Sequence, residues 1–140
     1  MTLQEKTLFR GKRVVDGEWV TGNYVNCYRP GNKRTTGHFI VEYPGEYYDE
    51  IYTVTVGRYT GLNDRDGTPI YEGDILQARF DDRYPDSVTT CVVVWHTDPH
   101  IGWFIRQVGR ACKPDPLDKY DSKYWEVVGN IHDDPELMQP

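Results

Sequence analysis

Glycines and carboxylates alternate along one stretch of the chain, TVGRYTGLNDRDGTPIYEGDILQARF, which runs from Thr55 to Phe80. Residues of these types build cation-binding loops, phosphate-binding loops or tight turns between strands. An EF-hand register with Gly67 at the sixth position puts Leu62 at the first and Gly73 at the last, so two essential oxygen ligands are missing. The stretch also lacks the Gly-Lys-Ser or Gly-Lys-Thr of a phosphate loop. Both kinds of ion-binding loop are therefore excluded in these forms.

The same residues have a structural interpretation. In NDRDG we expect Gly67 to adopt a positive φ, with Asp64 accepting hydrogen bonds from backbone N–H groups of a hairpin turn. In EGD we expect Gly73 to allow a turn that a side chain would obstruct, just before Asp74 and the next strand. All four residues are thus predicted to be structural turn residues.

Other residues with reactive side chains have less suitable spacing. His96, Asp98 and His100 stand close together in HTDPH, but Pro99 opposes the helix that would align the two imidazoles. No GxSxG or HExxH sequence occurs, and no Cys–His pair has a recognisable spacing. The cysteines stand too far apart for a zinc ribbon or a disulfide framework: Cys27, Cys91 and Cys112. We therefore expect no catalytic residue, no metal and no cofactor, and predict that the protein is not an enzyme.

Charge and aromatic residues supply the candidates for binding. Residues 1–45 carry seven Lys and Arg against four acidic residues, whereas the other 95 residues carry nine against 18. An acidic body repels phosphate backbones, but the basic first part could contact nucleic acid or the acidic face of another subunit. The predicted binding surface combines basic and aromatic residues of the first part: Arg29, Lys33, Arg34, Tyr47 and Tyr48.

Further aromatic residues lie in predicted strands, where they form either core or a stacking platform for bases or peptides. They are Tyr52, Trp95, Trp103 and Trp125, in addition to Tyr47 and Tyr48. Residue type alone leaves both alternatives open, although strand aromatics are more often core.

The elements that position these residues are predicted to be strands, because helical periodicity is almost absent. Asp16-Gly17 indicates a type I′ hairpin turn, and RPGNKRTTG indicates a polar loop. Residues 51–59 alternate as a half-buried strand does, and Val92–Trp95 indicates a strand covered on both faces. Asp134 and Pro135 are typical of the first positions of a helical turn.

These patterns predict a mainly β protein with little helix. Residues 51–140 supply the strands for an SH3-like small β-barrel, and residues 1–50 supply an N-terminal β-hairpin subdomain packed with it. No apolar run approaches the roughly 20 residues of a membrane span, and MTLQEKTLFRGKR lacks the apolar stretch of a signal peptide. We therefore expect a cytoplasmic protein without a membrane partner.

The motifs "VGRYTGLNDRDGTPIYEGDI" and "VVGNIHDDPEL" resemble the YopX family of phage and prophage proteins. The resemblance spans nearly the whole chain, from FRGK near Phe9 to Leu137. It implies a small, mainly β protein that is encoded by a bacteriophage or prophage and acts in the cytoplasm of the bacterial host. It implies no reaction and no catalytic residues.

Two functions follow from these observations. The first is a non-enzymatic accessory protein that binds a host or phage protein and forms a homo-oligomer, since aromatic-rich strands and opposed charges favour association. The alternative is a nucleic-acid-binding protein, in which the basic N-terminal segment neutralises phosphates and a sheet aromatic stacks on bases.

Overall fold

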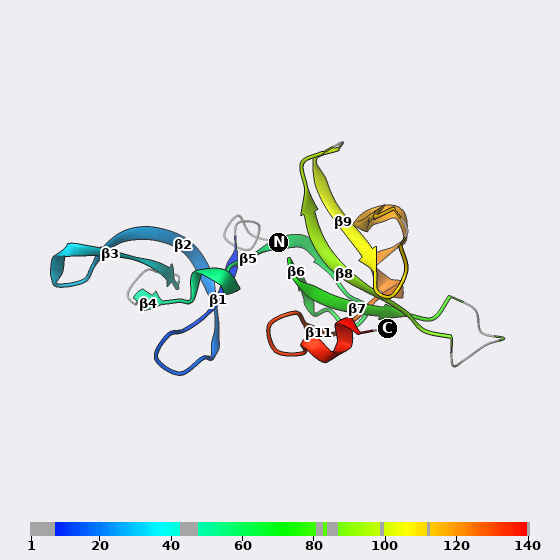
Figure 1. The fold of residues 1–140 in the computed structure, drawn as a ribbon, viewed down its shortest axis with the longest axis horizontal. Coiled ribbons are helices and arrows are strands. Elements are labelled where there is room, and N and C mark those ends of the chain that lie inside the picture. Colours follow the sequence, from blue (N-terminus) through cyan, green and yellow to red (C-terminus); the bar gives the residue numbers. More distant parts are fainter. Residues whose placement is uncertain are drawn as a thin grey trace. The chain divides into compact units, whose positions relative to one another are not determined.

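A computed structural model describes residues 8–42, 48–80, 83, 87–98, 100–111 and 113–139. The chain divides into two compact units, Met1–Tyr59 and Thr60–Pro140. This division falls inside a strand, β5 (Gly57–Asn63), whereas the domains expected from the sequence meet at residue 50. Each unit is described by itself below (Figure 1).

The first unit is an antiparallel sheet with the strand order β4-β3-β2-β1-β5. A small apolar cluster of Val20, Ile40 and Ile51 lies against this sheet. Its elements are β1 (Phe9–Lys12), β2 (Trp19–Arg29), β3 (Asn32–Val41), β4 (Tyr48–Glu50), the 3-10 helix η1 (Thr53–Thr55) and the start of β5.

The second unit contains a five-stranded antiparallel sheet with the order β10-β9-β8-β7-β11, together with the end of β5 and its neighbour β6. The strands are β6 (Pro69–Tyr71), β7 (Asp74–Ala78), β8 (Thr89–His96), β9 (Gly102–Gln107), β10 (Asp115–Pro116) and β11 (Glu126–Asn130). Two 3-10 helices lie between β10 and β11, η2 (Leu117–Lys119) and η3 (Ser122–Tyr124). A third, η4 (Pro135–Met138), follows β11.

The mainly β fold with little helix is confirmed, as two antiparallel sheets. No closed barrel is found among the strands that the structure describes, so the SH3-like barrel stays a prediction. No helix within the described ranges has the length and apolar content that crossing a bilayer requires.

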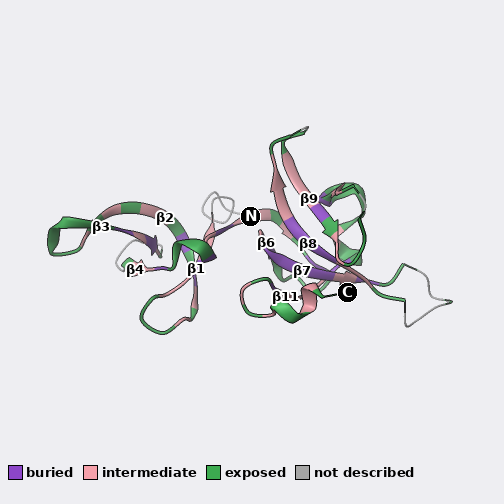
Figure 2. Ribbon diagram, viewed as in Figure 1, coloured by how far each residue is buried: buried purple, intermediate pink, exposed green. Residues whose placement is uncertain are grey.

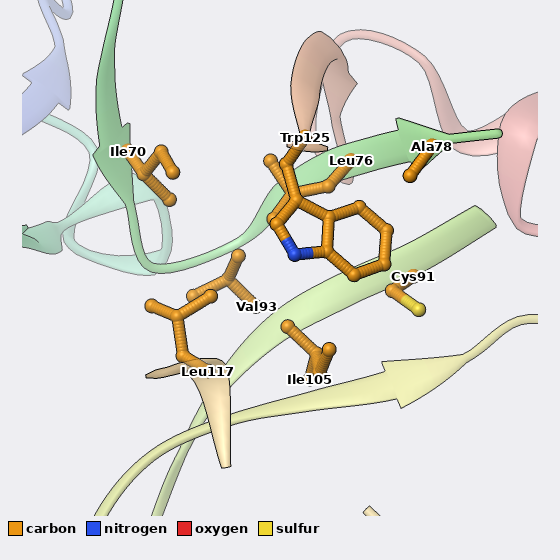
Figure 3. Packing of buried hydrophobic residues seen from close by; sticks show 8 residues of the cluster. All are labelled: Ile70, Leu76, Ala78, Cys91, Val93, Ile105, Leu117 and Trp125. Carbon is orange, nitrogen blue, oxygen red and sulfur yellow. The ribbon is translucent and has the colours of Figure 1, made fainter. Parts of the chain in front are cut away.

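The core of the second unit lies on one face of its sheet and is centred on Trp125. The indole packs over β7 and β8 (Figure 3) and is only 1% exposed. β7 is buried along most of its length and β8 at its centre (Figure 2), where Ile75, Val92 and Val93 are also enclosed. The strand predicted to be covered on both faces is thus confirmed at Val92 and Val93, while Trp95 is half-buried. The core cluster comprises Ile70, Leu76, Ala78, Cys91, Val93, Ile105, Leu117 and Trp125.

Three local predictions for the first unit are wrong. RPGNKRTTG is not a loop but the distal end of the long β2–β3 hairpin, in which Arg29 pairs with Asn32 around a two-residue turn. Pro30 and Gly31 form that turn, with Gly31 at φ 75°, which is the arrangement of a type II turn. Thr36 and Gly37 pair with Tyr28 and Cys27, and the register shifts between Tyr28 and Arg29, so residues 33–35 form an irregularity in the ladder. The polar composition therefore does not prevent the segment from continuing the hairpin.

The second wrong prediction is the strand over residues 51–59. Its middle is the 3-10 helix η1, and Val54 is 80% exposed. The Thr55 hydroxyl donates to the carbonyl of Tyr52 at 2.6 Å and accepts from the Lys12 N–H at 2.9 Å. This side chain therefore stabilises a local turn that competes with extended backbone.

The hairpin turn at Asp16-Gly17 is also not type I′. That turn needs positive φ at both central residues, and Gly17 has φ 73° while no described non-glycine residue has a positive φ. The connection between β1 and β2 is longer than the two-residue loop of a type I′ hairpin, because Lys12 pairs with Trp19 and the Gly17 N–H donates to the Arg13 carbonyl within it. At the other end of the chain the helical turn is confirmed as η4 with Pro135 at its first position. The Asp134 carboxylate does not cap η4 and instead accepts from the Asn130 N–H at 3.1 Å.

Candidate binding surfaces

The carboxylate of Asp64 organises the turn that the sequence singled out. Its Oδ1 accepts hydrogen bonds from the N–H groups of Asp66 and Thr68, both at 2.9 Å, and Gly67 has φ 83°. Its Oδ2 accepts from the Val127 N–H of β11, also at 2.9 Å. Asp64 is only 5% exposed, so one buried side chain joins the turn to a strand more than 60 residues away in sequence.

Gly73 and Asp74 occupy the second turn. The Gly73 N–H donates to the Val93 carbonyl at 2.9 Å, and its carbonyl accepts from the Ile131 N–H at 3.0 Å. Asp74 is buried and accepts from the Tyr71 N–H at 2.7 Å. Gly73 has φ 87°, so this turn also uses a backbone region that favours glycine. The partners of both turns lie within the protein itself.

Replacing Gly67 by valine tests the first turn. We expect the substitution to lower the free energy of unfolding by roughly 1–3 kcal/mol, because a β-branched residue is strained at positive φ. The cost comes from the backbone alone, since a Cβ at Gly67 would have no neighbour within 4 Å. Gly67→Asn is the matched control and should cost less, because asparagine tolerates this region better. Equal urea midpoints for the wild type and the valine variant would contradict the turn geometry.

The predicted basic and aromatic surface is only partly assembled by the structure. The Arg29 guanidinium holds both carboxylate oxygens of Glu50, at 3.0 and 2.8 Å, and donates to the Thr36 carbonyl at 2.7 Å. Arg29 therefore ties β2, β3 and β4 together, and its charge is already paired. Lys33 and Arg34 are exposed near the turn of the β2–β3 hairpin. Tyr48 lies on β4 and its ring is nearly perpendicular to that of Phe39, with centroids 6.2 Å apart, and Tyr47 lies outside the described residues.

The Arg29–Glu50 pair gives the first unit a dependence on pH. The hydrogen bonds from Arg29 lower the pKa of Glu50 below its ordinary value of 4.5, against the opposing effect of desolvation. A carboxylate with a lowered pKa stabilises the folded state above the unfolded pKa, and this contribution is lost as the pH falls. We expect Glu50→Gln to unfold at lower urea than the wild type at neutral pH, with the two midpoints converging below pH 4.5. A constant difference between them across the acid range would contradict this assignment.

The histidine cluster considered from the sequence is not brought together as a metal site. Within the described part of the chain, no three His, Cys, Asp or Glu side chains are grouped as metal ligands. The His96 ring stacks on Phe104 with centroids 4.9 Å apart. His100 is exposed and lines a different feature, an apolar groove.

This groove lies in the second unit and was not predicted. It has a volume of about 660 Å³ and is mostly apolar. It runs beside β9, where the Trp103 ring is half-buried, and Ile101, just before this strand, is 75% exposed. Trp103 also contacts Trp95 edge to face, with centroids 4.9 Å apart. The groove is lined by Thr60, Leu62, His100, Ile101, Gly102, Trp103, Phe104, Pro114, Pro116, Leu117 and Asp118.

One sequence signal does point to the groove. Trp103 is one of the aromatic residues that the sequence allows to be either a core residue or part of a ligand-binding surface. The structure gives it both roles, because Trp103 packs against the core cluster and also lines the groove. The other walls come from segments around residues 60, 100 and 116. Only the fold brings these segments together.

The chain is thus a mainly β protein whose second unit combines an apolar groove with turns held by internal hydrogen bonds. It belongs to the YopX family, whose family model, described as YopX protein, matches residues 8–139. No match was found among curated proteins.

A solved structure shares the fold. The crystal structure of protein EF1440 from Enterococcus faecalis superposes with a TM-score of 0.51 at 20% sequence identity. The match covers 95% of this chain and 98% of the other. At this identity the similarity concerns the fold alone.

Proposed function

We propose that this YopX protein is a phage- or prophage-encoded accessory protein that acts in the bacterial cytoplasm by binding another protein. In this proposal it is not an enzyme, it uses no cofactor, and it self-associates. The observation that carries the proposal is the groove beside β9.

The groove has features that a protein segment can use. Concave, mostly apolar pockets with a few polar groups that set orientation are typical of small-molecule sites, and grooves lined by apolar and aromatic residues also bind peptide segments. Here the polar side chains are Thr60, His100 and Asp118, set among apolar and aromatic residues. Aromatic side chains are also enriched in the cores of protein interfaces. Ile101 at 75% exposure supplies apolar surface that a partner would remove from water.

Sedimentation velocity tests the self-association. At micromolar concentration we expect a species heavier than the 16.3 kDa protomer, and we expect it to shift toward the protomer on dilution. A protomer mass at all concentrations would contradict self-association. Binding of other proteins would then be judged by partner capture alone.

Nucleic-acid binding is the second candidate, and the end of the β2–β3 hairpin favours it. Lys33 and Arg34 are exposed there, and Tyr28 on the same hairpin is 60% exposed. Exposed cations and an exposed ring on one element are the combination that binds single-stranded nucleic acid. Arg29 contributes less than the sequence suggested, because Glu50 already pairs with it.

Fluorescence anisotropy with labelled single- and double-stranded DNA tests this second candidate. Binding should weaken steeply with salt, and the Lys33→Ala, Arg34→Ala double variant should reduce the salt slope by about 2, roughly one for each phosphate that is no longer neutralised. Arg79→Ala, an exposed cation of the acidic unit, is the matched control. No binding at low salt would exclude this function.

A further inference from the structure

We infer that the groove beside β9 binds an extended, proline-containing protein segment that carries a lysine or arginine. This inference rests on the proposed function, and it names the chemical class of the partner. It follows from the shape of the groove, from its hydrogen-bonding groups and from its charge.

The lining favours proline rings over a polar ligand. Trp103 presents a half-buried ring, and Pro114, Pro116 and Ile101 add apolar surface. The Phe104 ring does not take part, because it stacks on His96 on the opposite face of β9. Aromatic-lined grooves are the surfaces on which polyproline segments dock, because such segments are already extended in solution and lose little entropy on binding.

The hydrogen-bonding groups of the groove point to the same class. Its polar side chains are few: Thr60, His100 and Asp118. A bound peptide whose backbone N–H groups found no acceptor would lose affinity. The Thr60 hydroxyl is already engaged, since it donates to the Ile70 carbonyl and accepts from the Leu62 N–H. Proline lacks the backbone N–H, so a proline-containing segment asks for fewer acceptors from these side chains.

Charge selects a basic segment. Asp118 is exposed and lines the groove, whereas the nearby Asp115 carboxylate is already held by Lys119 at 3.1 Å. Residues 60–140 contain 15 Asp and Glu against 8 Lys and Arg, so the whole unit attracts cations and repels acidic ligands. A Lys or Arg of the partner would pair with Asp118 at the edge of the groove.

The test is a selection of random displayed peptides on the full-length protein. We expect enrichment of peptides that combine proline with Lys or Arg, and weaker binding of these peptides at high salt. Synthetic copies of the selected peptides are then measured by fluorescence anisotropy. Replacing their prolines by alanine, or their basic residues by glutamate, should weaken binding by about tenfold or more, the equivalent of about 1.4 kcal/mol.

Three protein variants place the binding in the groove. Ile101→Asp should weaken binding by about tenfold or more, and Asp118→Asn should reduce both the affinity and its salt dependence. Both residues are exposed, so neither substitution should disturb folding. The matched control is Val15→Asp, at an apolar residue of the first unit that is 84% exposed, and it should bind like the wild type.

Other results overturn the inference. Enrichment of acidic or helix-forming peptides that Ile101→Asp abolishes would show that the groove binds proteins of a different class, which leaves the proposed function intact. Proline-containing peptides that bind Ile101→Asp and Asp118→Asn as well as the wild type would place their site elsewhere. A selection without any enrichment also refutes this partner class, while the proposed function is decided by capture of intact proteins.

Discussion

Replacing Trp125 by alanine is expected to lower the free energy of unfolding of the second unit by about 3–5 kcal/mol, the cost of truncating a large buried aromatic side chain. Trp125 is 1% exposed, and its indole packs in the core contributed by β7, β8 and β9 (Figure 3). Its ring also meets Phe80 edge to face with centroids 5.4 Å apart. Alanine would leave a cavity at the centre of the only large apolar cluster described for this unit.

Hydrogen exchange of the β7 and β8 amides is the measurement, because it reports the stability of the second unit by itself. Tyr124→Ala is the matched control, since the neighbouring Tyr124 is exposed and surface substitutions usually change stability by no more than about 0.5 kcal/mol. Trp125→Phe should fall between the two. Equal protection in Trp125→Ala and Tyr124→Ala would show that Trp125 is not the centre of the core.

The second large effect is expected at Asp64. Asp64→Ala removes three hydrogen bonds from backbone N–H groups to a buried carboxylate. Hydrogen bonds to charged groups contribute roughly 1.5–3 kcal/mol each and are not additive, so we expect a loss of about 3 kcal/mol or more. Asp64→Asn separates the contributions, because its remaining oxygen can still accept from Asp66 and Thr68 but its amide cannot accept from Val127.

Urea unfolding of the three proteins gives the expected order, with Asp64→Ala least stable, Asp64→Asn intermediate and the wild type most stable. Asp66→Ala is the control, since Asp66 is an exposed neighbour in the same turn. If Asp64→Ala were as stable as Asp66→Ala, the carboxylate would not join the turn to β11.

Much of this turn could be predicted from the sequence, because its chemistry is local. The positive φ of Gly67 and the bonds from Asp66 and Thr68 to Asp64 follow from residues within one short segment. The bond from Val127 does not, since nothing in NDRDG specifies which distant strand approaches it. Local patterns also misled where hydrogen bonds that composition does not specify decided the structure. Part of the polar RPGNKRTTG segment pairs within its own hairpin. The alternating residues 51–59 turn because the Thr55 hydroxyl bonds to the Tyr52 carbonyl and to the distant Lys12 N–H.

The binding surfaces were harder to predict for a related reason. Arg29 was counted as an available cation, but the fold places Glu50 within hydrogen-bonding distance and pairs its charge. The groove depends on segments around residues 60, 100 and 116 that have no common sequence motif. Trp103 was recognised as a candidate, but only its neighbours in space distinguish a groove wall from a purely core position.

Partner capture tests the central claim, that the protein works by binding another protein through the groove beside β9. Wild-type, Ile101→Asp and Val15→Asp chains are immobilised, exposed to lysates of phage-infected bacteria, and compared by quantitative mass spectrometry, and each enriched protein is then purified and bound directly. We predict one or more proteins that bind the wild type and Val15→Asp but are lost from Ile101→Asp. Identical binding to all three chains, or no specific binding to any, would contradict the claim.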